Sequence, residues 1–199
     1  MSGFSAKKVS RVGQSHVVDE NILHRGHWSE MVELSYKDEK KQVRKWEAVN
    51  RKEQTAAVII VAQLKPSNRY IIIRQFRPPT DSYILEFPAG LVDPGEEIED
   101  AARRELIEET GFTGKVIKQS PSLFSSPGIL SETVAFVQIS VDENNFKNKQ
   151  PEPKNEPGEF ITVFLKYPHE ISEFFHEEFQ KGVLFDAKLY AYFLAQGIL

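Results

Sequence analysis

The stretch GLVDPGEEIEDAARRELIEETGF, residues 90–112, decides the fold and the chemistry of this 199-residue chain. When the stretch is placed on a helix at about 100° per residue, Glu105 and Glu109 both lie within about 20° of Ile98, in the middle of an apolar stripe. Carboxylates on a face that turns inward cost several kcal/mol each unless something neutralises them. We therefore expect a positive group to complete this site.

The donor atoms indicate which cation that group is. All donors in the stretch are carboxylate oxygens, the chain has no cysteine, and no histidine falls within residues 90–112. Hard oxygen donors suit Mg²⁺ or Mn²⁺ and argue against Zn²⁺. Because Mg²⁺ often binds one or two carboxylates together with a substrate's phosphates, phosphate chemistry is the expected function. The alternative is a solvated acidic helix face, paired to Arg103 and Arg104.

The stretch resembles the Nudix box, G-x5-E-x7-R-E-U-x-E-E-x-G-U, where U is a bulky apolar residue. The matching residues are Gly90, Glu96, Arg104, Glu105, Leu106, Glu108, Glu109, Gly111 and Phe112. Nudix proteins are Mg²⁺-dependent hydrolases of nucleoside diphosphates linked to another group. The resemblance implies that Glu105 and Glu109 bind metal and that Glu108 is a further candidate. It leaves Glu96 as either an outer ligand or a partner of Arg104.

The composition is that of a compact catalytic domain, with 40% hydrophobic residues and 14 phenylalanines to form a core. A net charge of −4 argues against a general polyanion-binding protein, so no nucleic acid partner is expected. The longest apolar run, Ala56–Ala62, is too short to span a bilayer, and residues 1–11 contain no apolar signal core. The lack of cysteine fits a reducing compartment. We expect a cytoplasmic protein, with the nucleus left open.

Strands dominate the predicted secondary structure. Apolar and polar residues alternate in 30–36 and 42–49, which predicts a hairpin around residues 37–40. Two buried strands, 55–64 and 70–76, are predicted around the turn 65–68. Further strands are expected at 83–87, 115–119, 133–140 and 160–165, and helices in the box and at about 169–180 and 187–196.

This order predicts an α/β (α+β) fold. The Nudix resemblance implies a mixed β-sheet sandwiched between helices, with an N-terminal β extension at residues 1–50 and a Nudix domain at residues 51–199. Residues 142–158 are polar, contain three prolines and are too long for an ordinary connection. They form either a disordered excursion or a lid that carries Glu159 to the phosphates.

Three further motifs are similar to the ADP-ribose pyrophosphatase branch of the family, in particular the eukaryotic ADP-sugar enzymes. They are Trp46-Glu47-x-x-x-Arg51, Arg74-x-x-Arg77-Pro78-Pro79 and Glu86-Phe87-Pro88-Ala89-Gly90. Pro127, fifteen residues after Phe112, matches a proline that marks the branch. This resemblance covers the chain from about Trp28 to the C-terminal helix.

The branch resemblance implies a homodimer with shared active sites. In such a dimer, Trp28 and Trp46 stack adenine from different subunits, although single tryptophans are often packing anchors. Glu47 would hydrogen-bond the adenine edge. Arg51 and Arg77 would hold the pyrophosphate or the terminal ribose. Arg51 aligns with either of two family arginines, because the segment of residues 51–54 is shorter than the corresponding segment in close relatives.

The same resemblance implies that the Ala89 carbonyl joins Glu105 and Glu109 on the metal, as does Glu159, the late acidic residue of the mobile loop. Leu91 would touch the substrate. Ser126 stands where close relatives carry an acid before Pro-Gly, which weakens the ribose contact expected there.

The expected reaction is hydrolysis of ADP-ribose and related ADP-sugars to AMP and ribose 5-phosphate, with two or three Mg²⁺ ions per site. Metal-bound water would attack phosphorus while Arg77 stabilises the developing charge. Glu159 is the first candidate for the general base and Glu108 its competitor, and Glu109 is a further catalytic candidate. Two alternatives stay open: a Nudix hydrolase of NADH or 8-oxo-dGDP, and a non-catalytic ADP-ribose-binding module.

Overall fold

The computed structural model describes residues 12–52, 56–155 and 157–199. Contacts divide the chain into two compact units. Unit 1 comprises residues 1–57 and 121–134, and unit 2 comprises residues 58–120 and 135–199. The expected division at residue 50 took no account of the segment 121–134, whose contacts are with the N-terminal strands. Such a long-range association leaves no mark on local periodicity.

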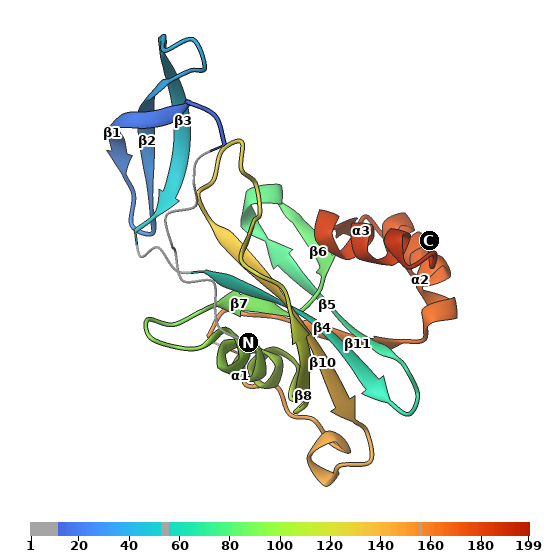
Figure 1. Cartoon of the computed structure of the whole chain (residues 1–199). Helices are drawn as coiled ribbons and strands as arrows, with labels where there is room; N and C mark the ends of the chain where they lie inside the picture. The colour runs from blue at the N-terminus through green and yellow to red at the C-terminus, as the bar shows by residue number, and fades with distance from the viewer. Residues whose placement is uncertain (1–11, 53–55, 156) are drawn as a thin grey trace. The chain divides into compact units, whose positions relative to one another are not determined.

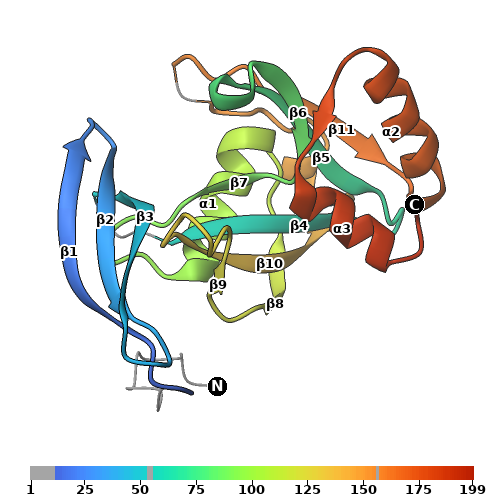
Figure 2. The ribbon, with the colours of Figure 1, turned by 90° about the horizontal axis from the view of Figure 1, so that it is seen from above.

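Unit 1 contains an antiparallel sheet in the order β1-β2-β3 (Figures 1 and 2). The strands are β1 (His16–Arg25), β2 (Ser29–Lys37) and β3 (Val43–Arg51). The predicted hairpin is confirmed as β2 and β3, with Lys37 opposite Val43. The Asp38 carboxylate closes its turn by accepting hydrogen bonds from the backbone N–H groups of Lys40 and Gln42, both at 2.9 Å.

The segment 121–134 is tied to β3 by backbone hydrogen bonds. The N–H of Val49 donates to the carbonyl of Ile129 at 2.8 Å, and Val49 forms an isolated bridge with Leu130. The short strand β9 (Leu123–Phe124) pairs with the beginning of β10 (Thr133–Asp142). Through these contacts, the segment 121–134 packs against the sheet of unit 1.

Unit 2 is built on a mixed sheet whose strands follow the order β12-β6-β5-β4-β10-β8, with β11 paired to β5 and β7 paired to β4. The pair β12–β6 is parallel, and β5–β6 and β10–β8 are antiparallel. Helix α1 lies on one side of the sheet and helices α2 and α3 on the other (Figure 1). The predicted mixed sheet between helices is confirmed. The elements not yet bounded are β4 (Ala57–Lys65), β5 (Tyr70–Arg77), β6 (Ser82–Glu86), β7 (Ala89–Leu91), α1 (Ile98–Thr110), β8 (Lys115–Gln119), β11 (Thr162–Lys166), α2 (Ile171–Gln180), β12 (Leu184–Phe185) and α3 (Ala187–Ala195), with 3-10 turns η1 (Pro78–Thr80), η2 (Phe146–Asn148) and η3 (Pro168–Glu170).

The core of unit 2 follows from the apolar runs in its central strands. Residues 58–62 of β4 and 70–73 of β5 are buried without alternation, as expected for strands covered on both faces. Leu106 of α1 and Phe193 of α3 are fully buried, and each contributes roughly 1.5–3 kcal/mol by leaving water. This packing fixes α1, which carries most of the candidate site.

Helix α1 ends at Gly111, and two constraints require glycine at this position. Gly111 has φ 74°, and its N–H donates to the carbonyl of Ile107 at 2.8 Å. A Cβ atom at Gly111 would lie 2.3 Å from the backbone nitrogen of Glu152. Gly111 therefore forms a left-handed cap, and the loop after β10 packs against it.

The loop of residues 142–158 is structured over much of its length, so its interpretation as a disordered excursion is wrong for residues 142–155. Asn148 is buried, and its side chain accepts a hydrogen bond from the N–H of Thr113 and donates to the carbonyls of Thr113 and Asp142. The N–H of Lys154 donates to the carbonyl of Glu108 at 2.7 Å. None of the helices in the described ranges has the length and apolar character needed to cross a membrane.

Candidate active site

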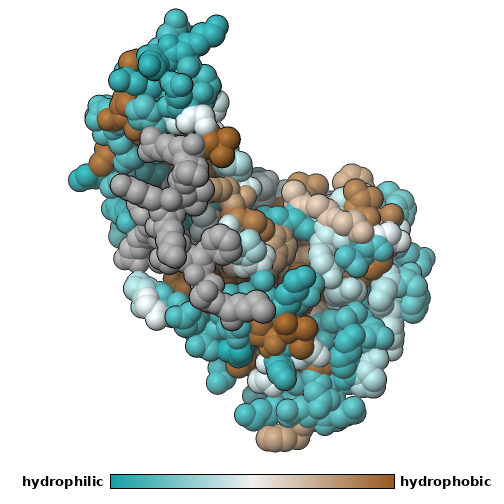
Figure 3. All heavy atoms as spheres, in the orientation of Figure 1, coloured by the Kyte–Doolittle hydropathy of each residue, from teal (hydrophilic) through white to brown (hydrophobic). Residues whose placement is uncertain are grey.

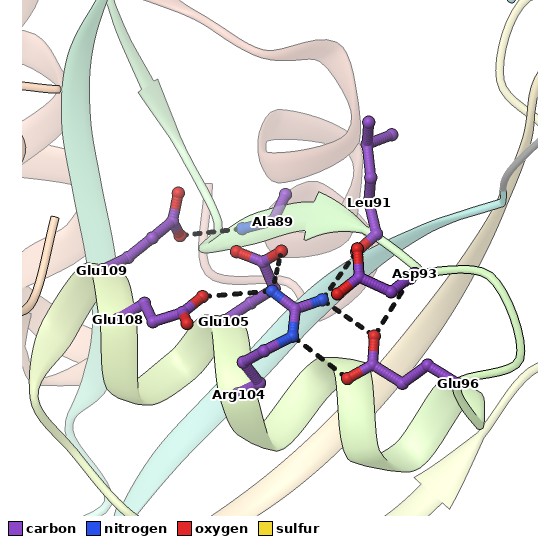
Figure 4. A network of polar contacts seen from close by, with 8 residues as sticks. All are labelled: Ala89, Leu91, Asp93, Glu96, Arg104, Glu105, Glu108 and Glu109. Atoms are coloured by element: carbon purple, nitrogen blue, oxygen red, sulfur yellow. Dashed lines mark hydrogen bonds and ion pairs between the residues drawn. The ribbon is translucent and has the colours of Figure 1, made fainter. Parts of the chain in front are cut away.

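Helix α1 presents Glu105, Glu108 and Glu109 on the side that faces β7 (Figure 4). Glu109 is 5% exposed, the Glu105 side chain is 14% exposed and that of Glu108 is 41% exposed. The inward orientation that the helical phase predicts for Glu105 and Glu109 is therefore confirmed. Glu108 lies at the border of this face, as its angle on the helix indicates.

Gly90 on β7 makes room for this arrangement. A Cβ atom at Gly90 would lie 1.9 Å from the carboxyl carbon of Glu105, which is far inside van der Waals contact. Only glycine lets the strand approach α1 this closely. The first residue of the box thus has a steric role.

Glu109 is held by the main chain of β7. Its Oε2 atom accepts a hydrogen bond from the N–H of Ala89 at 3.0 Å. Burial raises the pKa of Glu109 to about 9, and the nearby charges of Glu105, Glu86 and Glu159 contribute to the rise. Burial likewise raises the pKa of Glu105 above its ordinary value, although Arg104 opposes the rise. A nearby cation would stabilise the charged form of both carboxyls and so lower their pKa values.

Arg104 organises the remaining acids (Figure 4). Its Nη1 donates to Glu105 at 2.8 Å and to Glu108 at 3.1 Å, while Nε and Nη2 donate to the two oxygens of Glu96 at 3.0 and 2.8 Å. Nη2 also donates to the carbonyl of Leu91 at 2.9 Å. Of the two roles left open for Glu96, the structure shows the pairing with Arg104.

The donor set fits a hard divalent cation. Glu105, Glu109 and the main chain of Ala89 offer only oxygen ligands close together on α1 and β7. Among the residues the structure describes, no three acidic or histidine side chains already stand in metal-binding geometry. Glu105 is engaged by Arg104, so it would turn away from this arginine to reach a cation.

Arg77 and Glu86 form a second charged pair in unit 2. The guanidinium donates from Nε and Nη2 to the two carboxylate oxygens of Glu86, both at 2.9 Å. Burial lowers the pKa of Arg77, but the bond to Glu86 and the charges of Glu109 and Asp186 outweigh it and raise the pKa overall. Glu86 was not among the expected site residues, although it begins the Glu86-to-Gly90 motif.

Glu159 lies past the loop, in unit 2. Together with Arg74, Tyr83 and Asn155 it lines a cavity of about 530 Å³. Its charge makes a small contribution to the raised pKa of Glu105 and of Glu109, after that of burial. Unit 2 therefore brings together the expected residues Arg77, Ala89, Leu91, Glu105, Glu108 and Glu109, with Glu159 coupled to them through its charge.

Unit 1 carries the other expected substrate-binding residues, Trp28, Trp46, Glu47, Arg51 and Ser126, and contains a cavity of about 670 Å³. Trp46 and Arg51 line it together with Pro127, Gly128 and Glu132. The Trp46 indole N–H donates to the Gly128 carbonyl at 2.9 Å, which fixes the ring, and Arg51 Nε donates to Glu132 at 2.5 Å.

Three of the expected residues are not part of the described lining of this cavity. Trp28 is 78% exposed and contacts His27 edge-on, with ring centroids 4.4 Å apart. Glu47 follows Trp46 on β3, so the two side chains point to opposite faces. The carbonyl of Ser126 accepts hydrogen bonds from the N–H groups of the loop that carries it. Glu132 is the cavity residue that sequence reasoning missed, because its proximity to β3 depends on tertiary structure.

Comparisons with known proteins match most of the chain. The model of the NUDIX domain family matches residues 53–192. The chain is 35% identical over 194 residues to the ADP-sugar pyrophosphatase of Mus musculus, covering 94% of this chain and 89% of the mouse protein. It is 33% identical over 180 residues to the ADP-ribose pyrophosphatase of Saccharomyces cerevisiae, covering 86% and 77%. A crystal structure of an ADP compounds hydrolase superposes with a TM-score of 0.60 at 25% identity and covers 82% of this chain and 86% of the other. The matched range contains every acid of the unit 2 cluster.

Proposed function

Because this chain belongs to the Nudix family, we propose that it hydrolyses the pyrophosphate of ADP-ribose and related ADP-sugars, releasing AMP and ribose 5-phosphate from ADP-ribose. The observation that carries this proposal is the cluster of buried acids on α1, arranged by Arg104 beside β7. Buried acids of this kind are costly, and a metal–pyrophosphate complex is the ligand that would offset that cost. The names of the two relatives support the same substrate class.

Nudix hydrolases use divalent metal ions, and we assign two or three Mg²⁺ ions here, with Mn²⁺ as a substitute. Glu105, Glu109, Glu159 and the Ala89 carbonyl would hold them. Bound metal supplies charge neutralisation for the pyrophosphate and lowers the pKa of coordinated water. The chain's own contribution is to hold Glu109 against β7 and to place Glu105 one turn away on the same face of α1.

We assign Arg77 the role of stabilising the negative charge that develops on the phosphoryl oxygens. Its guanidinium is oriented by two bonds to Glu86, so it does not have to be ordered during the reaction. Glu159 is assigned as the base that takes the proton of the attacking water onto a carboxylate oxygen. Glu108 is the competitor, and Arg104 donates a hydrogen bond to its carboxylate.

Unit 1 is assigned to recognition of the nucleotide. Trp46 offers an indole face and Arg51 a cation for the pyrophosphate. We further propose a homodimer with shared sites, in which the second stacking surface is Trp28 of the other subunit. The exposed tryptophan supports this, as do the apolar side chains that Figure 3 shows on the β1–β3 sheet. The exposed apolar residues of these strands include Val17, Val18, Leu23, Met31 and Val43.

A substrate panel tests the proposed function. The full chain is incubated with ADP-ribose, ADP-glucose, NADH or 8-oxo-dGDP in Mg²⁺, and the products are identified by chromatography. We expect AMP and ribose 5-phosphate from ADP-ribose as the fastest reaction, and no products from a Glu105→Gln, Glu109→Gln double variant. Faster cleavage of NADH or 8-oxo-dGDP would favour the alternative hydrolase. Tight binding of ADP-ribose without cleavage would favour the non-catalytic module.

A further inference from the structure

Unit 2 contains a cavity of about 530 Å³, and of its described lining the proposed function uses Glu159 alone. Arg74 of β5 lines this cavity and stands three residues before Arg77, so the two side chains point to opposite faces of the sheet. Arg74 donates to Glu178 of α2 and therefore reaches the cavity from the face opposite to α1 (Figure 1). The volume lies within the range of small-molecule sites, roughly 300–1,000 Å³.

The ion pairs around Arg74 leave an excess of one positive charge. Glu178 has 2% of its side chain exposed and accepts hydrogen bonds from Arg74 Nη1 and from Lys181 Nζ, both at 2.7 Å. Burial raises the pKa of Glu178, but the bonds from Lys181 and Arg74 outweigh it and lower the pKa overall, so the carboxylate is charged. Arg74 and Lys181 both line the cavity, and two cations on one carboxylate favour an anion beside them.

The same cavity has aromatic side chains that are open to solvent. Tyr83 is 52% exposed and Phe160 is 81% exposed, and both belong to the lining. The Cζ atom of Arg74 lies 6.0 Å from the centre of the Tyr83 ring, so the ring stands beside the cation. An exposed ring is a stacking surface for a flat base. The lining therefore offers cations for a phosphate next to a ring for a base.

Asn155 adds an acceptor without a partner. Its Oδ1 atom is buried and accepts no hydrogen bond from the residues that the structure describes. A buried acceptor in this state is costly to the folded protein. Because Asn155 lines the cavity, a ligand with an N–H or O–H donor can supply the missing bond. A ribose hydroxyl is such a donor, and so is the amino group of adenine, which asparagine side chains commonly bind.

We propose that this cavity is a second binding site, specific for a nucleoside monophosphate. The phosphate binds Arg74 and Lys181, the base stacks on Tyr83, and a donor group of the nucleoside reaches Asn155. Glu159 lines the cavity as well, and its negative charge limits the affinity for the phosphate. The inference goes beyond the proposed function, because binding here needs no cleavage. AMP is the probe, since it is the nucleotide that the proposed reaction releases.

Calorimetry with AMP in the presence of a chelator tests the proposal without turnover. The full-length Trp46→Ala variant is titrated, because it lacks the ring assigned to nucleotide recognition in unit 1. We expect one AMP per chain to remain bound. Adding Lys181→Gln should weaken AMP binding about 10-fold or more, through loss of a charge-assisted bond to phosphate. Adding Lys188→Gln instead is the matched control, because Lys188 pairs with Asp186 and is absent from the described lining, and it should change the affinity less than about twofold.

Two further substitutions separate a ligand-binding role from a structural one. In the Trp46→Ala chain, Asn155→Ala should weaken AMP binding about 10-fold and raise the urea midpoint of the ligand-free protein, because the unpaired acceptor is gone. Loss of an ordinary structural hydrogen bond would lower that midpoint. Glu159→Gln should tighten AMP binding about threefold or more, because it removes a negative charge from the lining.

Smaller ligands define the chemical class. Inorganic phosphate, ribose 5-phosphate and adenosine should each bind about 10-fold or more weakly than AMP, because each lacks the base or the phosphate. Phosphate binding as tight as that of AMP would overturn the assignment to a nucleotide. The proposal is also wrong if Trp46→Ala binds no AMP, or if Lys181→Gln leaves its affinity unchanged. Since no readout depends on hydrolysis, failure of this inference and failure of the proposed function are distinguishable.

Discussion

At Glu109, burial favours the protonated carboxyl, whereas the proposed metal binding requires the charged carboxylate. Its pKa is raised from 4.5 to about 9 because the side chain is buried. Between these two values the folded protein keeps a proton that the unfolded chain has released, so the free energy of unfolding falls as pH rises through this window. Stability from this group is fully present below about pH 4.5 and is lost by about pH 9.

We therefore expect Glu109→Gln to stabilise the metal-free protein at alkaline pH. At pH 8 the gain should be on the order of 2–4 kcal/mol, and at pH 5 it should nearly vanish. Urea unfolding in the presence of a chelator measures both. Glu99→Gln, at a half-buried position of α1, is the control and should leave the pH dependence intact. An unchanged slope in Glu109→Gln would show that this carboxyl does not titrate as described.

Arg77 is the second residue at which geometry makes a sharp prediction. Lysine keeps the charge but cannot make the two parallel bonds to Glu86. We expect Arg77→Lys to lower kcat about 100-fold with ADP-ribose, because the charge is no longer held in one orientation. Arg103→Lys, which alters a partly exposed pairing with Glu99 and Asp100, should leave kcat within about twofold. A near-normal kcat in Arg77→Lys would remove this arginine from the proposed mechanism.

At the scale of elements, the end of α1 combines two separate steric demands. Gly111→Ala forces alanine into positive φ and brings its Cβ against the backbone of Glu152. Gly182→Ala meets the first demand alone, because Gly182 has φ 85° and nothing within 4 Å of a built Cβ. We expect unfolding free energies to fall by about 1–2 kcal/mol at Gly182 and by about 2–4 kcal/mol at Gly111. Equal losses in urea unfolding would mean that the loop yields freely.

Element prediction from the sequence was accurate where local pattern decides the outcome. The long apolar runs of β4 and β5 and the pattern of the box helix were sufficient to predict these elements. Thr55, the first residue of the first predicted buried strand, lies outside the described residues. Strand β1 was not predicted, because its mostly polar sequence becomes a strand by pairing along β2. The two-residue strands β9 and β12 exist only through their partners. The same distinction applies to the site: helical phase gave Glu105 and Glu109, whereas Glu86 and Glu132 depend on pairing across the fold.

At the scale of the whole molecule, the two tryptophans of unit 1 bear on subunit organisation. Trp46 lines the unit 1 cavity, while Trp28 is largely exposed and is absent from the described lining. If adenine stacks between Trp28 of one subunit and Trp46 of the other, each site of a homodimer draws one tryptophan from each chain. A heterodimer of Trp28→Ala and Trp46→Ala subunits then has one site that lacks both rings and one site that keeps both.

Mixing the two variants therefore tests the shared site directly. Each variant alone should raise KM for ADP-ribose about 10-fold or more through loss of one stacking surface. After subunit exchange at a 1:1 ratio, about half of the dimers are mixed, so about a quarter of all sites are intact. We expect a low-KM phase of about that amplitude to appear on mixing and to be absent from the unmixed variants. If no such phase appears although sedimentation shows exchanged dimers, both rings act within one chain, because every site then carries one substitution.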